Sequence, residues 1–491
     1  MNKIKMLTAV LAITMMFSCE SFLEDPQPSQ SLPSSTAFTK GSDVLTGLIG
    51  AYNYLQDSDV GGTNFTMIPD IMTENGDWRG SFTSYQDISQ FKMTADNGEI
   101  ENMWRDGYRS INAANLVIEA SQSVEDAGFT VAQRNQYRGE GLFIRAAIHF
   151  EMVRFYGKPY GSTSSSDPGI SLMVAAVEDV TDITFPERSS VEAVYSQCEI
   201  DLQEAVTLLE GFSERGRASS NAAKCYLAEI AFMKRDYPTA ATLASEVIGS
   251  GDYELTAEPA DFFVNEGSSE EIFTVVHTTQ DNPGVNGSLP TFHNEDGRGG
   301  DVVYSQDLLE NGFGKVITAD QQTAIDGAGG TVRDMRLVQL SDTTAGITFI
   351  EKYEDPVTNA DDAPIWRLAE LMLMRAEARA RTEGINMGSV NLLNRVRTRS
   401  LRVVDGDGNL LANSDELVSF QESDFADANE LIEAIILERR VELCFEGNHF
   451  HDLMRLGRSA KGLAPDADKL RFPIPQTALD ANSGLMQNPG Y

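Results

Sequence analysis

The chain has 491 residues, of which 41% are hydrophobic and 23% are charged, the composition of an ordinary globular protein. Its 74 Asp and Glu against 38 Lys and Arg give a formal net charge of −36. This acidity argues against nucleic acid as a partner, because binding to phosphates needs clustered Lys and Arg. The length allows one large domain, or two to three ordinary ones, with a sizeable core.

The N-terminus has the pattern of an export signal. Two lysines precede an apolar run over 6–17, which is too short to remain as a bilayer-spanning helix. The run ends at Cys19 rather than at an Ala-x-Ala site, so residues 1–18 resemble a bacterial lipoprotein signal peptide. We expect cleavage before Cys19, which then becomes the first mature residue and carries the lipid. The alternative is a plain signal peptide next to a coincidental cysteine.

Residues 19–36 are rich in Pro, Ser and Gln and predict an extended tether behind the lipidated cysteine. Acidic residues soon after Cys19 resemble the surface-export signal of Bacteroidetes lipoproteins. No later apolar run approaches the length of a membrane span. We therefore expect a mature protein that is anchored to a membrane by its lipid and does not cross it.

Helical periodicity dominates the rest of the chain. Apolar residues recur at spacings of three and four over 134–157 and 190–209, which indicates amphipathic helices. Residues 221–248 place small and aromatic residues at the offsets of a tetratricopeptide repeat, and 366–399 carry a looser second copy. Several such helix pairs must stack to bury a common core. The sequence therefore predicts a mainly α fold.

Two long segments, about 57–100 and 250–365, lack this periodicity and contain only short strand-like pieces. Loops of this length are usually functional or disordered, and their aromatic content argues against disorder. We divide the mature chain near this second segment, into an N-terminal helical region at 37–250 and a C-terminal region at 251–491.

The stretch 405–416 resembles a helix–loop–helix calcium loop. Four candidate ligands occupy loop positions one, three, five and twelve: Asp405, Asp407, Asn409 and Glu416. The glycine required at position six is absent, because Leu410 stands there. A polar hairpin tip is the favoured interpretation, with calcium as the alternative. No other cofactor is expected.

A densely charged stretch is ERRVELCFEGNHFHDLMRLGR at 438–458. Its carboxylates and two histidines, His449 and His451, suggest a metal or acid–base site. However, the helix predicted over 430–446 turns its apolar residues inward, so its charged side chains are placed to pair across packed helices and loop ends. We expect this stretch to hold the fold together.

Several segments together resemble the SusD/RagB family. They are FLEDPQPSQSLPSSTAFTKGSDVLTGLIGAYNYL, MWRDGYRSINAANLVIEA, RGEGLFIRAAIHFEMVRFYG, AELMLMRAEARA with LLNRVRTRS, ILERRVELCFEGNHFHDLMRLGR and the ending FPIPQTALDANSGLMQNPGY. The resemblance runs almost end to end, and it is the combination that is specific. One departure is His449, where members of the family usually carry Arg.

The resemblance implies a lipoprotein of the Bacteroidetes outer membrane that is exposed at the cell surface and binds nutrients, most often glycans. Such proteins sit as a lid over a SusC-like TonB-dependent transporter and are not enzymes. The implied fold is α, with tetratricopeptide-like helical pairs as scaffold and loops that carry the ligand site.

Glycan binding needs flat aromatic faces that stack on sugar rings, together with carboxylates, amides and Arg that hydrogen-bond to hydroxyls. The resemblance assigns the ligand contacts to the early loop and to the central segment, without identifying individual residues. Nine candidates supply this mixture: Asn75, Asp77, Trp78, Arg79, Phe82, Tyr85, Phe292, His293 and Tyr304. The alternative is that Trp78 or Phe292 is simple loop packing.

Three other functions stay open at this point. The ligand could be a peptide, as in RagB-like uptake lipoproteins, because Arg79 and Asp77 would serve either ligand. A surface glycoside hydrolase is a second alternative, since 74 carboxylates allow some pair at hydrolase spacing, although no nucleophile elbow, HExxH, phosphate loop or CxxC motif occurs. The third is a protein-interaction scaffold, a common role of tetratricopeptide arrays.

Overall fold

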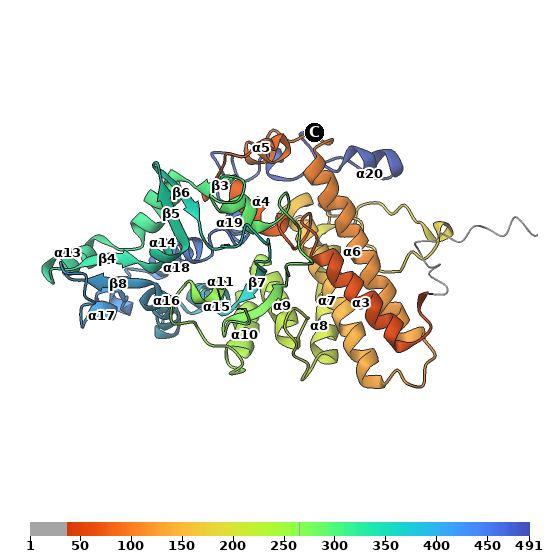
Figure 1. Ribbon diagram of the computed structural model, residues 1–491, viewed down its shortest axis with the longest axis horizontal. Coiled ribbons are helices and arrows are strands. Elements are labelled where there is room, and N and C mark those ends of the chain that lie inside the picture. Colours follow the sequence, from red (N-terminus) through yellow and green to blue (C-terminus); the bar gives the residue numbers. More distant parts are fainter. Residues whose placement is uncertain (1–36, 265) are drawn as a thin grey trace, which may run out of the picture.

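The computed structural model describes residues 37–264 and 266–491, and it is mainly helical and elongated (Figure 1). The signal peptide predicted at 1–18, the tether at 19–36 and the lipidation site Cys19 lie outside the described residues. In the described part of the chain, no helix is both long and apolar enough to cross a membrane.

The first half of the chain is built from long helices that lie side by side at one end of the molecule (Figure 1). Its helices are α3 (Gly41–Leu55), α4 (Asn64–Ile71), α5 (Thr83–Ser89), α6 (Gly98–Ser123), α7 (Val131–Tyr156), α8 (Val191–Leu208), α9 (Ser220–Met233) and α10 (Tyr237–Ile248). Polar caps start most of them: the side chain of Asn97 accepts from backbone N–H groups of α6, and Thr130 forms a capping box with Gln133 at α7. Glycines let α6 and α7 approach closely, since a Cβ at Gly141 would stand 2.9 Å from Ile118.

The second half has shorter helices and most of the strands. Its helices are α11 (Asp261–Val264), α12 (Leu289–His293), α13 (Ala319–Gly327), α14 (Met335–Leu340), α15 (Leu368–Glu383), α16 (Met387–Ser400), α17 (Ser414–Val418), α18 (Ala428–Glu442), α19 (His449–Leu456) and α20 (Gln476–Ala481). The strands of the described chain are β1 (Gly76–Trp78), β2 (Glu271–Val275), β3 (Val302–Tyr304), β4 (Thr331–Asp334), β5 (Ser341–Thr344), β6 (Ile347–Ile350), β7 (Ala363–Arg367) and β8 (Leu401–Val404).

The predicted helical pairs are confirmed. Helices α9 and α10 pack against each other around the turn at Asp236, whose side chain caps α10. Helix α15 packs against α16, and α10 also packs against α15, although more than a hundred residues separate the two along the chain. The helical array is therefore continuous in space across the long central segment.

The strands form antiparallel pairs, not a common sheet: β1 with β3, β2 with β7, β4 with β8 and β5 with β6. Three of the four pairs join segments far apart in sequence, so they fix the long segments onto the helical scaffold. One large apolar cluster runs from Val44 in α3 to Ile474 near the C-terminus, so both predicted regions contribute to a common core. The division near residue 250 stays a prediction.

Two sequence predictions need correction. The segments predicted as irregular hold short elements, including α4, α5, β1 and β3, which are too short for periodicity to reveal. The helix predicted over 430–446 ends at Glu442, because Phe445 and Gly447 adopt left-handed backbone conformations with φ of 64° and 83°.

Candidate functional site

The early loop and the central segment meet in the pairing of β1 with β3. Asp77 lies opposite Val303 and Trp78 opposite Val302. Beyond the strand, the backbone N–H of Arg79 donates to the carbonyl of Asp301 at 2.7 Å. The two regions singled out in the sequence therefore form one surface.

Four rings from these regions gather into an aromatic cluster, defined as Trp78, Phe82, Tyr85 and Phe292. The centroid of Tyr85 lies 5.0 Å from that of Trp78 and 5.6 Å from that of Phe292, and Phe82 stands 6.3 Å from Phe292. Helix α5, which begins just after Phe82, brings Tyr85 back toward β1, and α12 presents Phe292. Such offset and edge-to-face contacts stabilise a rigid aromatic surface.

Arg298 fixes the early loop to the central segment. Its guanidinium carbon lies 4.2 Å from the centroid of Phe82, within the range of a cation–π contact. The same group donates to Asp301 at 2.6 Å, to Asn286 at 2.7 Å and to the Ser81 hydroxyl at 3.4 Å. Because its polar hydrogens are directed to both segments, Arg298 holds the exposed side of the cluster in place.

Four of the nine candidate contacts remain accessible. Trp78 and Phe82 are half-buried, and Asp77 and Arg79 are exposed. In the described chain, neither the Asp77 carboxylate nor the Arg79 guanidinium makes a hydrogen bond or an ion pair. This surface therefore combines two partly open rings with a free anion and a free cation.

Three other candidates lie inside the fold. Asn75 is fully buried between Asp70, to which it donates at 2.9 Å, and Arg440, from which it accepts at 2.9 Å. His293 is fully buried with Nδ1 at 2.8 Å from the carbonyl of Leu289, and burial lowers the pKa of the imidazole to about 4. Tyr304 is buried as well, and its hydroxyl donates to a backbone carbonyl. These side chains support the surface from beneath.

The two remaining candidates are the inner members of the aromatic cluster. Phe292 is fully buried, and Tyr85 is 4% exposed with its hydroxyl donating to Asn64 at 2.8 Å. Their rings therefore pack behind Trp78 and Phe82. Which of the nine residues touch a ligand stays a prediction.

An open groove of about 720 Å³ lies beside Trp78, in the size range of ligand sites. We call it the Trp78 groove. Its lining includes the aromatic face, two amides, three carboxylates and two lysines: Trp78, Gln90, Gln306, Glu74, Asp77, Asp307, Lys461 and Lys469. This composition suits a ligand with many hydroxyl groups.

The lysines of the Trp78 groove come from the C-terminal part of the chain and were not predicted. The Lys461 ammonium donates to the carbonyls of Ile71 at 2.7 Å and Gly76 at 3.2 Å. Burial lowers the pKa of Lys461, and the nearby Asp77 opposes that change. No motif marks either lysine, because only the tertiary fold brings residues 461–469 next to β1.

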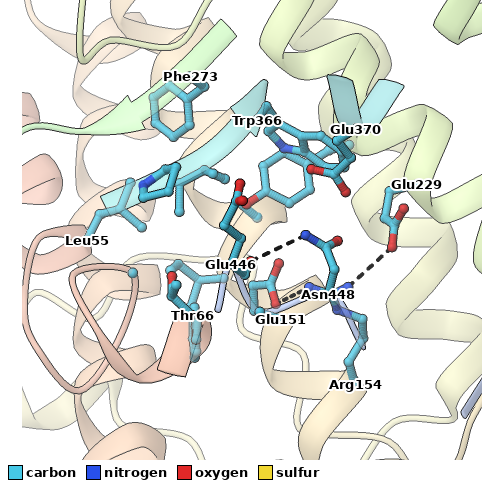
Figure 2. A pocket seen from close by; sticks show the side chains of 18 residues that line it. Leu55, Thr66, Glu151, Arg154, Glu229, Phe273, Trp366, Glu370, Glu446 and Asn448 are labelled. Atoms are coloured by element: carbon cyan, nitrogen blue, oxygen red, sulfur yellow. Dashed lines mark hydrogen bonds and ion pairs between the residues drawn. The ribbon is translucent and has the colours of Figure 1, made fainter. Parts of the chain in front are cut away.

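A second cavity lies in the interior, between α7, α9 and β7, and is lined by several charged side chains (Figure 2). Arg154 extends toward Glu229, 3.4 Å away, while Glu370 stands beside Trp366 (Figure 2). The volume is about 50 Å³, which accommodates a few water molecules and excludes a sugar ring. Burial raises the pKa of Glu370 to about 8 despite the nearby Arg439. This cavity is not an oligosaccharide site.

The charged C-terminal stretch forms a buried network of ion pairs, which we call the clasp. Glu442 accepts from Arg367 at 2.7 Å and from Arg336 at 3.2 Å, and it also pairs with Arg399. Although burial opposes the change, these arginines hold the pKa of Glu442 well below its ordinary value. On the same helix, Glu438 pairs with Arg336 at 2.6 Å and with Arg397 at 2.8 Å. The predicted pairing across packed elements is confirmed.

The histidines of this stretch lie on helix α19, not on an extended segment. Both are buried, and burial lowers the pKa of His449 to about 3 and that of His451 well below its ordinary value. Within the described residues, a metal-sized group of His, Cys and acidic side chains occurs only at Asp57, Asp59 and Asp106, away from the clasp.

The stretch 405–416 forms a hairpin tip. One oxygen of Asp405 accepts from the backbone N–H of Asp407 at 2.9 Å and of Asn409 at 2.8 Å, and Val404 bridges to Leu410. Asp405 therefore caps a turn, as expected for a polar hairpin. Calcium binding by Asp405, Asp407, Asn409 and Glu416 stays a prediction.

Comparisons of sequence are consistent with this architecture. A family described as starch-binding and associating with the outer membrane matches residues 21–232, and the SusD family matches residues 249–471. SusD-like protein P2 of Formosa agariphila is 26% identical over 536 aligned residues that cover 100% of both chains. SusD-like protein P38 of the same organism is 23% identical, over 98% of this chain and 97% of its own.

Comparisons of structure give the same fold. A putative sugar-binding protein from Bacteroides vulgatus has a TM-score of 0.76 at 22% identity, over 93% of this chain and 100% of its own. A laminarin-binding SusD-like protein has a TM-score of 0.69 at 21% identity, over 92% of this chain and 100% of its own. The mainly helical architecture is thus shared with solved structures.

Proposed function

This chain belongs to the SusD family, and from that premise we propose that it captures an oligosaccharide at the cell surface without cleaving it. It then delivers the ligand to a SusC-like TonB-dependent transporter of the outer membrane. The family supports a nutrient-binding role at that membrane, and the ligand contacts and the partner are our inference.

The observation that carries the proposal is the half-exposed ring of Trp78, which lines a groove together with amides, carboxylates and lysines. A rigid ring stacks on the apolar face of a sugar, and the surrounding polar groups bind its hydroxyls. Arg298, Tyr85 and Phe292 hold the rings before a ligand arrives, which lowers the entropy cost of binding.

The test is titration calorimetry of Trp78→Ala against a panel of oligosaccharides that includes laminarin fragments. We expect an affinity loss of about tenfold or more, because an aromatic residue at the centre of a binding site contributes about 2 kcal/mol. The free energy of unfolding should change little, since the ring is partly exposed. The matched control is Phe185→Ala, which removes a ring that is 61% exposed and does not line the groove. Equal affinity in Trp78→Ala and the control would place the site elsewhere.

A peptide ligand is the second candidate, favoured by the free Asp77 and Arg79 side chains. Two exposed opposite charges, one on β1 and one directly after it, can bind the ammonium and carboxylate groups of a short peptide. The same panel therefore includes tripeptides. Peptide binding that is lost in Arg79→Ala, with no oligosaccharide binding, would replace the glycan in our proposal.

Two further measurements test the non-enzymatic and anchored parts of the proposal. Incubation of the pure protein with the panel should leave every glycan intact, and cleavage products would show a hydrolase. Cys19→Ala should move the protein from the membrane fraction to the soluble fraction without lowering its melting temperature. An unchanged membrane fraction would contradict the lipid anchor. Co-purification of the transporter with the native protein tests the partner.

A further inference from the structure

A third pocket, of about 430 Å³, lies between α11, β2 and the segment 352–362. Helix α11 lies near the middle of the molecule (Figure 1). It shares no lining residue with the Trp78 groove. We call it the acidic pocket, because carboxylates outnumber cations along its walls.

Both cations that line the acidic pocket already have partners. Arg215 lies 3.1 Å from Glu271 and also pairs with Asp362. The Lys352 ammonium lies 2.5 Å from a carboxylate oxygen of Glu446, outside the pocket, and donates to the carbonyl of Glu442. Neither cation is free to neutralise another acid.

One wall carries three carboxylates without a cation: Glu354, Asp355 and Asp361. Asp355 accepts backbone N–H groups of a turn, and Asp361 accepts the N–H of Asp355 at 2.8 Å. Within the described chain, no Lys or Arg nitrogen reaches any of the three. Burial, with repulsion from Asp355 and Glu354, raises the pKa of Asp361 to about 6. The negative charge of this wall is therefore uncompensated.

A buried hydroxyl lines the same pocket without a partner. Thr274 on β2 is 2% exposed, and its Oγ1 makes no hydrogen bond. Leaving such a group unsatisfied destabilises a protein, and a hydroxyl oxygen accepts readily from an ammonium group. Phe262 and Phe263 add nearly perpendicular rings, 5.0 Å apart, as apolar walls. The pocket thus offers acceptors and apolar surface.

The charge and the size of the acidic pocket limit the kind of ligand that it can bind. Excess carboxylate excludes anions, and the volume is far larger than a metal ion. The metal-sized carboxylate group of the described chain lies elsewhere, at Asp57, Asp59 and Asp106. We infer that the acidic pocket binds the ammonium group of an organic ligand between Glu354, Asp361 and Thr274. The ammonium group belongs to an amino sugar or to a lysine side chain.

The probes are a glucosamine tetramer and trilysine amide, with their fully N-acetylated forms as neutral controls. Titration calorimetry uses the full mature protein carrying Trp78→Ala, so that stacking on Trp78 does not contribute. We expect both ammonium probes, or one of them, to bind at least about tenfold more tightly than the acetylated form, and to weaken with added salt. Binding of one probe alone identifies the source of the ammonium group.

Substitutions then locate the site. The double variant Glu354→Gln and Asp361→Asn keeps the shape of the wall and should weaken the ammonium probe about tenfold or more. The matched control is Glu422→Gln, which removes an exposed charge outside the pocket. Thr274→Val removes the buried hydroxyl alone and should weaken binding less. If the double variant does not fold, the affinity of Thr274→Val shows whether the ammonium probe binds in the acidic pocket.

Three results would overturn the inference. The first is that neither ammonium probe binds. In the second, the acetylated forms bind equally well. In the third, the pocket variants bind as tightly as Glu422→Gln. All three comparisons are made in the Trp78→Ala background, so they are independent of the oligosaccharide proposal.

Discussion

The clasp and the Trp78 groove use similar side chains in opposite environments. In the clasp, Glu438, Arg439 and Glu442 are at most 3% exposed, and each is paired with at least two partners. In the groove, Asp77 is exposed, as is the neighbouring Arg79, and neither side chain makes a hydrogen bond or an ion pair in the described chain. Charged side chains that are paired within the fold stabilise the arrangement of its helices and loops. Unpaired charged side chains beside the accessible ring of Trp78 are available to a ligand.

This difference is not visible in the local density of charge. The clasp is a densely charged stretch of the sequence, yet its charged side chains are already paired with one another or with neighbouring elements. The groove has fewer charged residues, drawn from three separate parts of the chain. We therefore expect substitutions in the clasp to change stability, and substitutions at the groove to change affinity.

Glu442→Ala should have the largest effect. It leaves Arg336, Arg367 and Arg399 around an empty position, and breaking a buried ion pair costs about 3–5 kcal/mol of unfolding free energy. Chemical denaturation measures the loss. The matched control is Glu383→Ala, which removes an exposed partner of Arg379 and should cost at most about 1 kcal/mol. If Glu442→Ala and Glu383→Ala lost the same unfolding free energy, the buried ion pairs of the clasp would be no more stabilising than an exposed pair.

Arg298→Ala should have the next largest effect, and we expect this effect on the affinity for the ligand. Without the guanidinium, Phe82 is no longer held between the early loop and the central segment, and we expect a loss of about 1–2 kcal/mol in ligand binding. Arg298→Lys should not restore it, because lysine lacks the planar fork that stacks and donates to several acceptors. Calorimetry compares both variants with the native protein, and full rescue by lysine would argue against this role.

The pH dependence of stability should reflect the buried groups. Burial raises the pKa of Glu370 to about 8 and that of Asp59 to about 7, so their favourable contribution is complete at low pH and is lost as the pH rises through these values. Burial lowers the pKa of His149 to about 3 and that of His293 to about 4, so their contribution is lost as the pH falls below their ordinary value of 6.5.

We therefore expect a maximum of the melting temperature in the weakly acidic to neutral range, measured by thermal unfolding across pH. Glu370→Gln should flatten the decline on the alkaline side. The same alkaline slope in this variant would show that another group causes the decline.

Tyr85→Phe should have the smallest effect. It keeps the ring but leaves the buried Asn64 side-chain oxygen without its donor, so the unfolding free energy should fall by about 1 kcal/mol. Ligand affinity should not change, because the hydroxyl faces the interior. A clear loss of affinity in calorimetry would instead place the Tyr85 hydroxyl among the ligand contacts.

Sequence reasoning succeeded where a long pattern carries the information. The amphipathic spacing in α7, α8 and the α9–α10 pair extends over enough residues to define a buried face. The same logic predicted the structural role of the clasp. The apolar residues of α18 point inward, and the charged residues next to them on the helix are therefore buried as well.

The same reasoning could not sort the candidate contacts. Asn75 and Asp77 are two residues apart, yet one is fully buried and the other exposed, because the partners Asp70 and Arg440 come from elsewhere in the fold. Lys461 reaches the groove from the far end of the chain. These placements depend on tertiary contacts that leave no local signal.

The packing of α10 against α15 has a consequence for how specificity changes. The segment 249–367 starts and ends on helices that already touch each other, so its ends are fixed whatever lies between them. The free energy of closing such a loop grows only slowly with its length. Insertions or deletions in this segment that leave Arg336 and Arg367 in place could therefore change recognition between members of the family while the helical scaffold and the clasp stay the same.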